Sequence, residues 1–245
     1  MSDHVLVEHT SPAVLTLTLS RPTIGNLVTM DMITNLTAGL KQATPETHVI
    51  VIRGAGADFC RGRDYQQAPE DARRQKTPSA LEISEKMTTP ILALYAGLKE
   101  TAVPTLSIVQ GRATGFGCAL SCACDLVIAG KSALFSLPEI KERGLPPTLA
   151  MTALLDRTSY RNLAYLVFSA SEIDASHALS AGLASAVHPD SDLEARASEV
   201  ISTISELPLD TLRSVKRYLQ LAPSVHPRAR AELGSNLYAV VASSR

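Results

Sequence analysis

The stretch from residue 111 to residue 139, GRATGFGCALSCACDLVIAGKSALFSLPE, carries the pattern that decides the fold. A glycine turn at residues 115–117 opens a run of small and apolar residues at helical spacing. Glycine lets a backbone approach a ligand closely, and the first N–H groups of a helix attract negative charge. A β-like run at 133–137 and the pair Pro138-Glu139 follow. An anion cradle and a carboxylate base near it are the two parts that enolate formation needs.

The composition predicts a soluble globular protein with one large domain, or a core with a small appendage. Of the 245 residues 45% are hydrophobic and 19% are charged. The net charge of −1 argues against nucleic acid or a membrane surface as a partner. No apolar run approaches the roughly 18 residues that a membrane span needs. Four cysteines without a signal-peptide pattern predict a reducing, cytoplasmic setting.

Hydrophobic periodicity predicts strands and helices on both sides of this stretch. Residues 14–19 alternate as a half-buried strand, 31–43 carry a helical stripe, and 48–53 form a short buried strand, which together predict a right-handed crossover. The charged residues 68–76 are predicted to be a mobile surface segment. Further patterns predict a strand at 105–109 and helices at 89–102, 149–155, 161–169, 175–181, 193–207 and 209–221.

Five segments, in this order, resemble the motifs of the crotonase superfamily of enoyl-CoA hydratases and isomerases. They are LSRP and GNLVT within 19–29, FCRGRD at 59–64, GRATGFGCALSCACD at 111–125, FSLPE at 135–139 and ALSAGLASAV at 178–187. The resemblance implies an α/β fold, a crotonase-like spiral of ββα units with a helical C-terminal region. It places a crotonase-like core at 1–190 and an oligomerisation region at 191–245, which implies a homotrimer or a dimer of trimers.

The same resemblance implies that the substrate is an acyl-CoA thioester and that coenzyme A belongs to the substrate, so no separate cofactor is expected. It assigns Glu139 as the catalytic base. The backbone N–H groups of Arg63 and Phe116 become the oxyanion hole that holds the thioester oxygen as its charge develops. In a comparable oxyanion hole one such donor stabilises the transition state by about 3 kcal/mol.

Four further residues are expected to contact the substrate: Arg61, Gly62, Gly115 and Gly117. Arg61 is predicted to meet a phosphate of coenzyme A, because guanidinium pairs well with phosphate. The side chain of Arg63 has a second interpretation, in which it points toward a carboxylate of the substrate. Both arginines also fit solvated surface positions.

The chain departs from the family pattern where hydratases carry two glutamates, because Ala119 stands at the first position and only Glu139 is retained. One carboxylate favours proton transfer between carbons, as in an enoyl-CoA isomerase. The alternatives are a hydratase or hydratase/lyase on an unusual acyl-CoA, a decarboxylase, or a non-catalytic protein that binds CoA thioesters. Phe116 replaces the middle glycine and is expected to narrow the acyl pocket.

The cysteine cluster Cys118, Cys122 and Cys124 predicts buried thiols on a packed helix rather than a metal site, because zinc needs four ligands and no histidine lies near. Asp125 is predicted to be structural. In the C-terminal helix Lys216 is expected on a solvated face, with a phosphate of a neighbouring subunit as the alternative. Tyr238 is expected to pack in a core or an interface.

Overall fold

The computed structural model describes residues 4–65 and 79–243 of the chain. Within these ranges the main sheet has the strand order β1-β2-β3-β4-β6-β9, and a smaller sheet has the order β5-β7-β8. The strands of the main sheet are β1 (Val5–Ser11), β2 (Val14–Leu19), β3 (Val49–Gly54), β4 (Thr105–Val109), β6 (Leu126–Gly130) and β9 (Ala186–His188). Those of the smaller sheet are β5 (Arg112–Thr114), β7 (Leu134–Ser136) and β8 (Ile173–Asp174).

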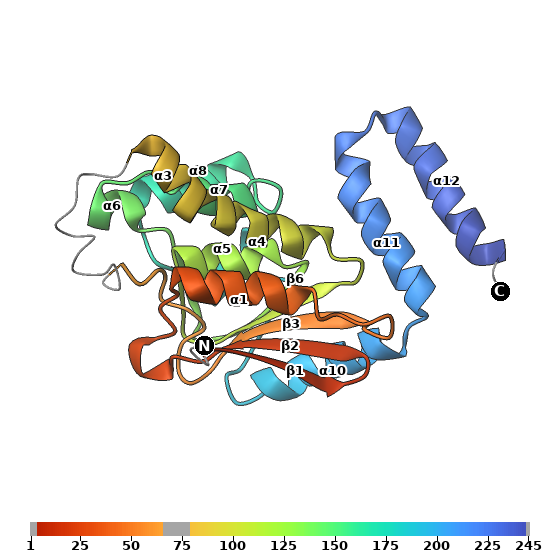
Figure 1. Ribbon diagram of the computed structural model, residues 1–245, viewed down its shortest axis with the longest axis horizontal. Helices are drawn as coiled ribbons and strands as arrows, with labels where there is room; N and C mark the ends of the chain where they lie inside the picture. Colours follow the sequence, from red (N-terminus) through yellow and green to blue (C-terminus); the bar gives the residue numbers. More distant parts are fainter. Residues whose placement is uncertain (1–3, 66–78, 244–245) are drawn as a thin grey trace.

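Helices fill most of the remaining chain, and the last ones follow each other without an intervening strand (Figure 1). The helices of the first part are α1 (Met30–Leu40), α3 (Ala80–Ile83), α4 (Thr89–Glu100) and α5 (Phe116–Ala123). The later helices are α6 (Glu139–Arg143), α7 (Thr148–Leu154), α8 (Tyr160–Ser169), α9 (Ala175–Ser180), α10 (Leu193–Glu206), α11 (Leu209–Leu221) and α12 (Pro227–Ser243). None of the helices in the described ranges is long and apolar enough to cross a membrane.

Parallel pairing in the main sheet comes from helical crossovers. β1 pairs with β2 antiparallel, and the pairs β2–β3, β3–β4, β4–β6 and β6–β9 are parallel. The predicted strand–helix–strand crossover at the start of the chain is therefore confirmed by β2, α1 and β3. The α/β class, with repeated strand pairs and helices and a helical C-terminal region, is confirmed as well.

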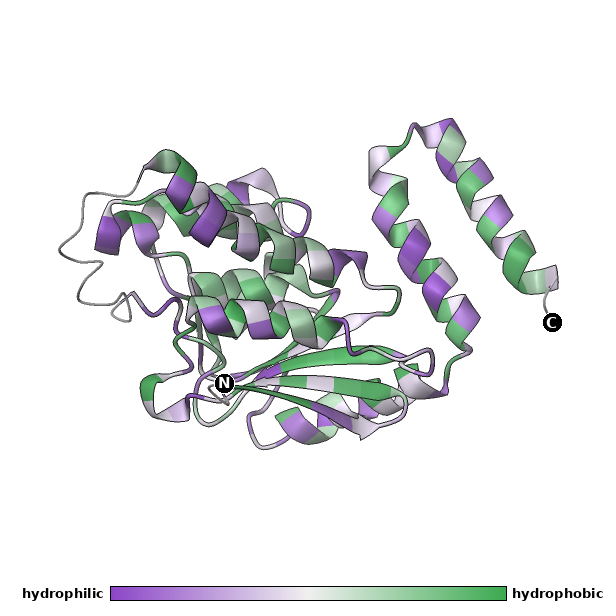
Figure 2. Cartoon of the chain, viewed as in Figure 1, coloured by the Kyte–Doolittle hydropathy of each residue, from purple (hydrophilic) through white to green (hydrophobic). Residues whose placement is uncertain are grey.

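Neighbouring residues of a strand point to opposite faces of the sheet, and this alternation divides the core into two layers. In β3, Ile50 and Ile52 belong to the layer that α1, α4 and α5 cover. Val49 and Val51 belong to the opposite layer, which α10 covers with residues such as Leu193. Figure 2 shows the strands as mostly hydrophobic between these helices. α5, which opens the functional region, is thus held in the interior.

The predicted boundaries agree with the structure to within a few residues. The strand at 105–109 and the helix at 209–221 are confirmed without change as β4 and α11. The helix predicted at 31–43 ends earlier, at Leu40. β1 and α12 were not predicted from the sequence. The predicted mobile segment at 68–76 lies outside the described residues, and the boundary between 190 and 191 stays a prediction.

The hairpin of α11 and α12 stands beside the sheet and its helices (Figure 1). Its anchor is Lys216, which is 3% exposed and whose Nζ donates to Asp125 Oδ2 at 2.5 Å. Gln220 adds hydrogen bonds from Nε2 to the carbonyl oxygens of Lys99 and Thr101. The prediction of a solvated Lys216 was therefore wrong, because a carboxylate from a distant part of the chain meets it in the interior.

Asp125 has the structural role that the sequence predicts. Its Oδ2 also accepts hydrogen bonds from the N–H and hydroxyl of Thr105, and Arg157 lies 3.8 Å from Oδ1. The carboxylate thus joins the start of β4, the segment after α7 and helix α11. Burial lowers the pKa of Lys216, an effect that the charge of Asp125 opposes.

Candidate active site

A cavity of about 890 Å³ opens where the loop after β3 meets the start of α5 and the segment from α6 to α7. Its walls combine charged and apolar side chains. Among the described residues that line the cavity are Arg61, Gly62, Arg63, Tyr65, Tyr95, Gly115, Phe116, Glu139, Glu142 and Arg143. Six of the seven site residues predicted from the sequence are in this set.

The start of α5 presents unpaired backbone to this cavity. Gly115 precedes the helix with a φ of +55°, and its N–H donates to the carbonyl oxygen of Ser136 at the end of β7. Phe116 is the first helical residue, so its own N–H has no acceptor inside the helix. The positive end of the helix dipole lies at the same place. This part of the cavity favours developing negative charge.

A second amide reaches the cavity from the loop after β3. The N–H of Val28 donates to the carbonyl oxygen of Gly62, and the N–H of Asp64 donates to the carbonyl oxygen of Val28. Because these groups face Val28, the N–H of Arg63 between them points to the other side. Gly62 has a φ of +110°, and a Cβ there would lie 3.3 Å from the carbonyl oxygen of Thr114. The loop thus runs beside the segment that leads into α5.

Glu139 follows β7 and begins α6, which places its carboxylate beside the start of α5. A Cβ on Gly115 would lie 2.7 Å from Glu139 Oε1 and would push the carboxylate aside, and the φ of +55° also favours glycine there. Within the described residues, Oε2 is buried without a hydrogen-bond partner. Burial raises the pKa of Glu139; a contact with its own backbone amide lowers it, the charge of Glu142 raises it and that of Arg143 lowers it. The net rise suits a general base that works near neutral pH.

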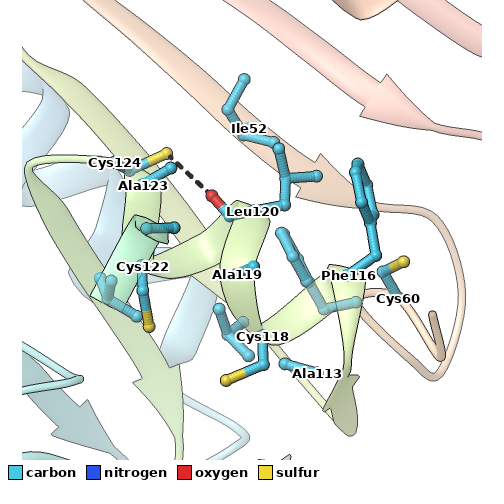
Figure 3. Packing of buried hydrophobic residues seen from close by; sticks show 14 of the residues in the cluster. Ile52, Cys60, Ala113, Phe116, Cys118, Ala119, Leu120, Cys122, Ala123 and Cys124 are labelled. Carbon is cyan, nitrogen blue, oxygen red and sulfur yellow. Dashed lines mark hydrogen bonds between the residues drawn. The ribbon is translucent and has the colours of Figure 1, made fainter. Parts of the chain in front are cut away.

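An aromatic pair forms the apolar wall of the cavity. The rings of Tyr95 and Phe116 lie 5.8 Å apart, centre to centre, and are tilted by 31°. Both side chains are buried, and the ring of Phe116 is seated among the core residues around Cys60 and Ala113 (Figure 3). Burial raises the pKa of Tyr95 well above its ordinary value. Phe116 therefore forms part of the wall next to its own amide.

The remaining predicted residues differ in position. Arg61 is exposed at the cavity, and its N–H donates to the carbonyl oxygen of Gly25. Gly117 is not among the lining residues, and a Cβ there would collide with the carbonyl oxygen of Cys60. Gly117 therefore allows α5 to pack closely on the loop after β3.

Ala119 and the cysteines are part of the core. Ala119 is fully buried in α5 and does not line the cavity. The cysteines Cys60, Cys118, Cys122 and Cys124 are buried and unpaired, which agrees with the prediction for the three on and after α5 (Figure 3). Burial raises the pKa of Cys60 to about 12. No group of side chains in the described ranges is arranged to hold a metal ion.

Sequence reasoning missed several residues of the site. Tyr95 looks like an ordinary core position of α4, because its spacing fits the helical stripe. Tyr65, Glu142 and Arg143 stand in segments without periodicity or a functional motif. Only one of the missed pairs had a signal in the sequence: Arg21 and Asp64 occur within two of the quoted motifs, and they form an ion pair at 2.9 Å.

Comparisons with known proteins show the family to which the chain belongs. The profile of the family "Enoyl-CoA hydratase/isomerase" matches residues 9–241. The chain is 30% identical over 234 residues to the 2,3-dehydroadipyl-CoA hydratase of Escherichia coli, which covers 94% of this chain and 88% of the relative. The crystal structure of an enoyl-CoA hydratase/isomerase family protein from Silicibacter pomeroyi is 26% identical, with a TM-score of 0.86 over 96% of this chain and 98% of the other.

A further structure supports the fold alone. It is a Thermobifida fusca protein, named as an enoyl-CoA hydratase and solved in complex with CoA, at 24% identity. Its TM-score is 0.87, with 98% of this chain and 93% of the other covered. Because the family profile spans nearly all of the sequence and the fold agrees over its whole length, the chain belongs to the enoyl-CoA hydratase/isomerase family of acyl-CoA enzymes.

Proposed function

We propose that the protein binds an enoyl-CoA thioester and moves its double bond by proton transfer through the single base Glu139. The observation that carries this proposal is the position of that carboxylate, which lies against Gly115 at the start of α5 and inside the same cavity as Arg63 and Phe116. The arrangement combines a base of raised pKa with two amides suited to a developing oxyanion.

The proposed reaction begins when Glu139 takes a proton from the carbon next to the thioester carbonyl. The electron pair left behind spreads over the conjugated system, and the thioester oxygen gains negative charge. The N–H groups of Arg63 and Phe116 hold that oxygen, which stabilises the dienolate as it forms. Glu139 then returns its proton two carbons further along the chain. Atoms and electrons balance, so the reaction needs no separate cofactor.

Among the described residues, the lack of a second carboxylate deep in the cavity supports isomerisation over water addition. Ala119 stands where the family's hydratases have their first glutamate, and its methyl group is buried in α5 away from the cavity. Asp64, another carboxylate at the cavity, forms an ion pair with Arg21. Glu139 therefore remains the carboxylate best placed to exchange protons with the substrate.

Hydration, alone or coupled to cleavage, is the second candidate, because one more carboxylate lines the cavity. Glu142 lies one helical turn after Glu139 in α6 and is exposed there. This position supports a mechanism in which Glu142 orients a water molecule and Glu139 transfers the proton to or from the substrate carbon. The name of the Escherichia coli relative, a hydratase, favours the same reaction.

The coenzyme A part of the substrate is assigned to the open side of the cavity. Arg61 is exposed there, and no described carboxylate pairs with it, so it is suited to a phosphate of coenzyme A. The four buried, unpaired cysteines favour a reducing, cytoplasmic setting.

The hairpin of α11 and α12 is assigned as the surface on which copies of the chain assemble into a homotrimer or a dimer of trimers. Its apolar side chains Val215, Leu219 and Tyr238 are 53–76% exposed and line one hollow between the two helices. An exposed apolar surface of this kind marks an interaction site in a protein that is otherwise well packed.

Mass spectrometry in heavy water tests the proposed reaction. A panel of 2-enoyl- and 3-enoyl-CoA thioesters is incubated with the protein and, in parallel, with the Glu139→Gln variant. A moved double bond with deuterium uptake, lost in the variant, is the expected result. A product heavier by one water identifies hydration instead. Unchanged thioesters throughout the panel contradict both reactions.

A further inference from the structure

The side chain of Arg63 is a half-buried cation without an anionic partner among the described residues. Its backbone amide belongs to the candidate oxyanion hole, but its guanidinium extends along the cavity wall toward α1. There Nη2 meets the sulfur of Met30 at 3.5 Å, a weak acceptor. Nε is buried and has no hydrogen-bond partner among the described residues. Burying an unpaired charged group is costly, so the position calls for an acceptor that the described part of the chain does not supply.

The surroundings of this guanidinium are aromatic and cationic. It lies 5.0 Å from the ring centre of Tyr65, and the guanidinium of Arg143 lies 3.5 Å from the same centre. Within the described residues, neither arginine forms an ion pair with a carboxylate. Burial lowers the pKa of Arg63, Tyr65 and Tyr95 oppose that effect, and Arg143 adds to it. This wall of the cavity therefore carries two guanidinium groups that no described carboxylate pairs with.

The carboxylates among the described residues that line the cavity are Asp64, Glu139 and Glu142. Asp64 pairs with Arg21, Glu139 lies against Gly115, and Glu142 is exposed on α6. The cavity thus has a basic function at Glu139 and a separate cationic function at Arg63. A plain hydrocarbon acyl chain has no hydrogen-bond acceptor for the guanidinium of Arg63, so Nε would stay without a partner when such a substrate is bound.

We propose that the acyl group of the substrate carries a carboxylate at its far end, which binds the guanidinium of Arg63 with Arg143 nearby. Guanidinium and carboxylate match as a two-point hydrogen-bonded pair, and in a buried place such charge-assisted bonds are the strong ones. The inference rests on the proposed function only in taking a CoA thioester as the ligand.

The length of the acyl group is limited because Arg63 is proposed to contact both of its ends. In the proposed complex the backbone N–H of Arg63 donates to the thioester oxygen, and the guanidinium of Arg63 donates to the far carboxylate. The distance between the two ends of the acyl group is therefore limited by the reach of a single arginine side chain. The acyl groups that fit are those of short dicarboxylic acids.

Equilibrium binding of unreactive thioesters tests the inference independently of turnover. Calorimetric titration compares succinyl-, glutaryl- and adipyl-CoA with butyryl-, valeryl- and hexanoyl-CoA, their counterparts without the second carboxylate. The wild type is expected to bind at least one carboxylated thioester roughly tenfold or more tightly than its counterpart, the size of one charged hydrogen-bonded contact. Arg63→Met keeps the backbone amide and is expected to abolish or reverse that preference, and Arg63→Lys to restore part of it.

Arg61→Met is the matched control, because its proposed contact is with coenzyme A and not with the acyl group. It is expected to weaken both members of each pair by the same factor. Equal or weaker binding of all three carboxylated thioesters by the wild type overturns the inference, as does a preference that survives in Arg63→Met. If plain enoyl-CoA is turned over and carboxylated thioesters bind no more tightly, the proposed function stands and the inference is wrong. If carboxylated thioesters bind more tightly but no thioester is turned over, the inference stands and the proposed function is wrong.

Discussion

Gly115 lies so near the carboxylate of Glu139 that a Cβ on Gly115 would be 2.7 Å from Oε1. The two residues come from different elements, the start of α5 and the start of α6. The hydrogen bond from the Gly115 N–H to the carbonyl oxygen of Ser136 joins these segments at 2.8 Å. The position of the base relative to the helix start is therefore fixed by a glycine.

Gly115→Ala is expected to lower kcat about 100-fold, because the added methyl group displaces the carboxylate and small misplacements of this kind have effects of that size. Gly144→Ala is the comparison. Gly144 also has a positive φ, +63°, but with its ψ of 21° it lies in the left-handed region that other residues can adopt, unlike Gly115 with its ψ of −114°, and its Cβ would meet nothing within 4 Å. Steady-state kinetics and thermal unfolding of both variants check the prediction, which fails if the two lose the same amount of activity.

Glu139→Gln is expected to bind CoA thioesters with nearly unchanged affinity and to lose turnover, because glutamine keeps the size of the side chain but accepts no proton. Calorimetric titration with a saturated thioester measures the first quantity, and the heavy-water assay measures the second. Glu142→Gln serves as the comparison at the exposed position on α6. If Glu142→Gln alone removed turnover, the assignment of the base would move to that residue.

The pH dependence of activity follows from the raised pKa of Glu139, whose ordinary value is 4.5. The base works in its ionised form, so kcat/KM is expected to rise with pH and to level off above the raised pKa, with a midpoint above 4.5. Burial is the largest cause of the shift. A profile of kcat/KM against pH measures the midpoint, and a value at or below the ordinary one would contradict a base in a desolvated place.

The same shift makes a prediction for stability. The folded protein holds the proton of Glu139 more tightly than the unfolded chain does, so this residue makes the free energy of unfolding fall as pH rises from 4.5 through the raised pKa. Glu139→Gln removes that contribution. We expect the variant to be more stable than the wild type at neutral pH and equally stable in acid below the ordinary pKa. Urea unfolding at several pH values compares them.

The sequence predicted most elements because their hydrophobic periodicity matches their burial. β4 is buried along its whole length, and α11 has a strongly amphipathic pattern, so both were predicted to the residue. α12 was not predicted because it buries none of its residues in this chain and therefore lacks a marked hydrophobic stripe. β1 was not predicted because it is the outermost strand of its sheet and is largely exposed.

The candidate site was predictable where local motifs carry it. The glycine turn and the Pro-Glu pair predict where the cradle and Glu139 stand, and the structure brings them together. Tyr95 and Lys216 were not predictable, because their surroundings depend on contacts that are distant in sequence. Lys216 and its partner Asp125 are 91 residues apart.

Lys216→Met is expected to destabilise the protein by about 3–5 kcal/mol, the usual cost of removing one partner of a buried ion pair. Asp125 would keep its contacts with Thr105 and Arg157 but lose its closest cation. Arg217→Met, an exposed neighbour on α11, is the control and is expected to change stability by less than about 0.5 kcal/mol. Urea unfolding measures both. Equal effects would mean that the buried pair does not anchor α11.

Tyr238→Glu and Leu219→Glu are expected to reduce the oligomer to smaller species, because each puts a charge on the exposed apolar face of the hairpin. The side chains are 76% and 63% exposed, so a monomer should tolerate the substitutions without losing its fold. Light scattering coupled to size-exclusion chromatography measures the mass, and circular dichroism checks the fold. Tyr238→Phe keeps the apolar ring and should leave the mass unchanged. A wild-type protein that is already monomeric at micromolar concentration would contradict the assembly through α11 and α12.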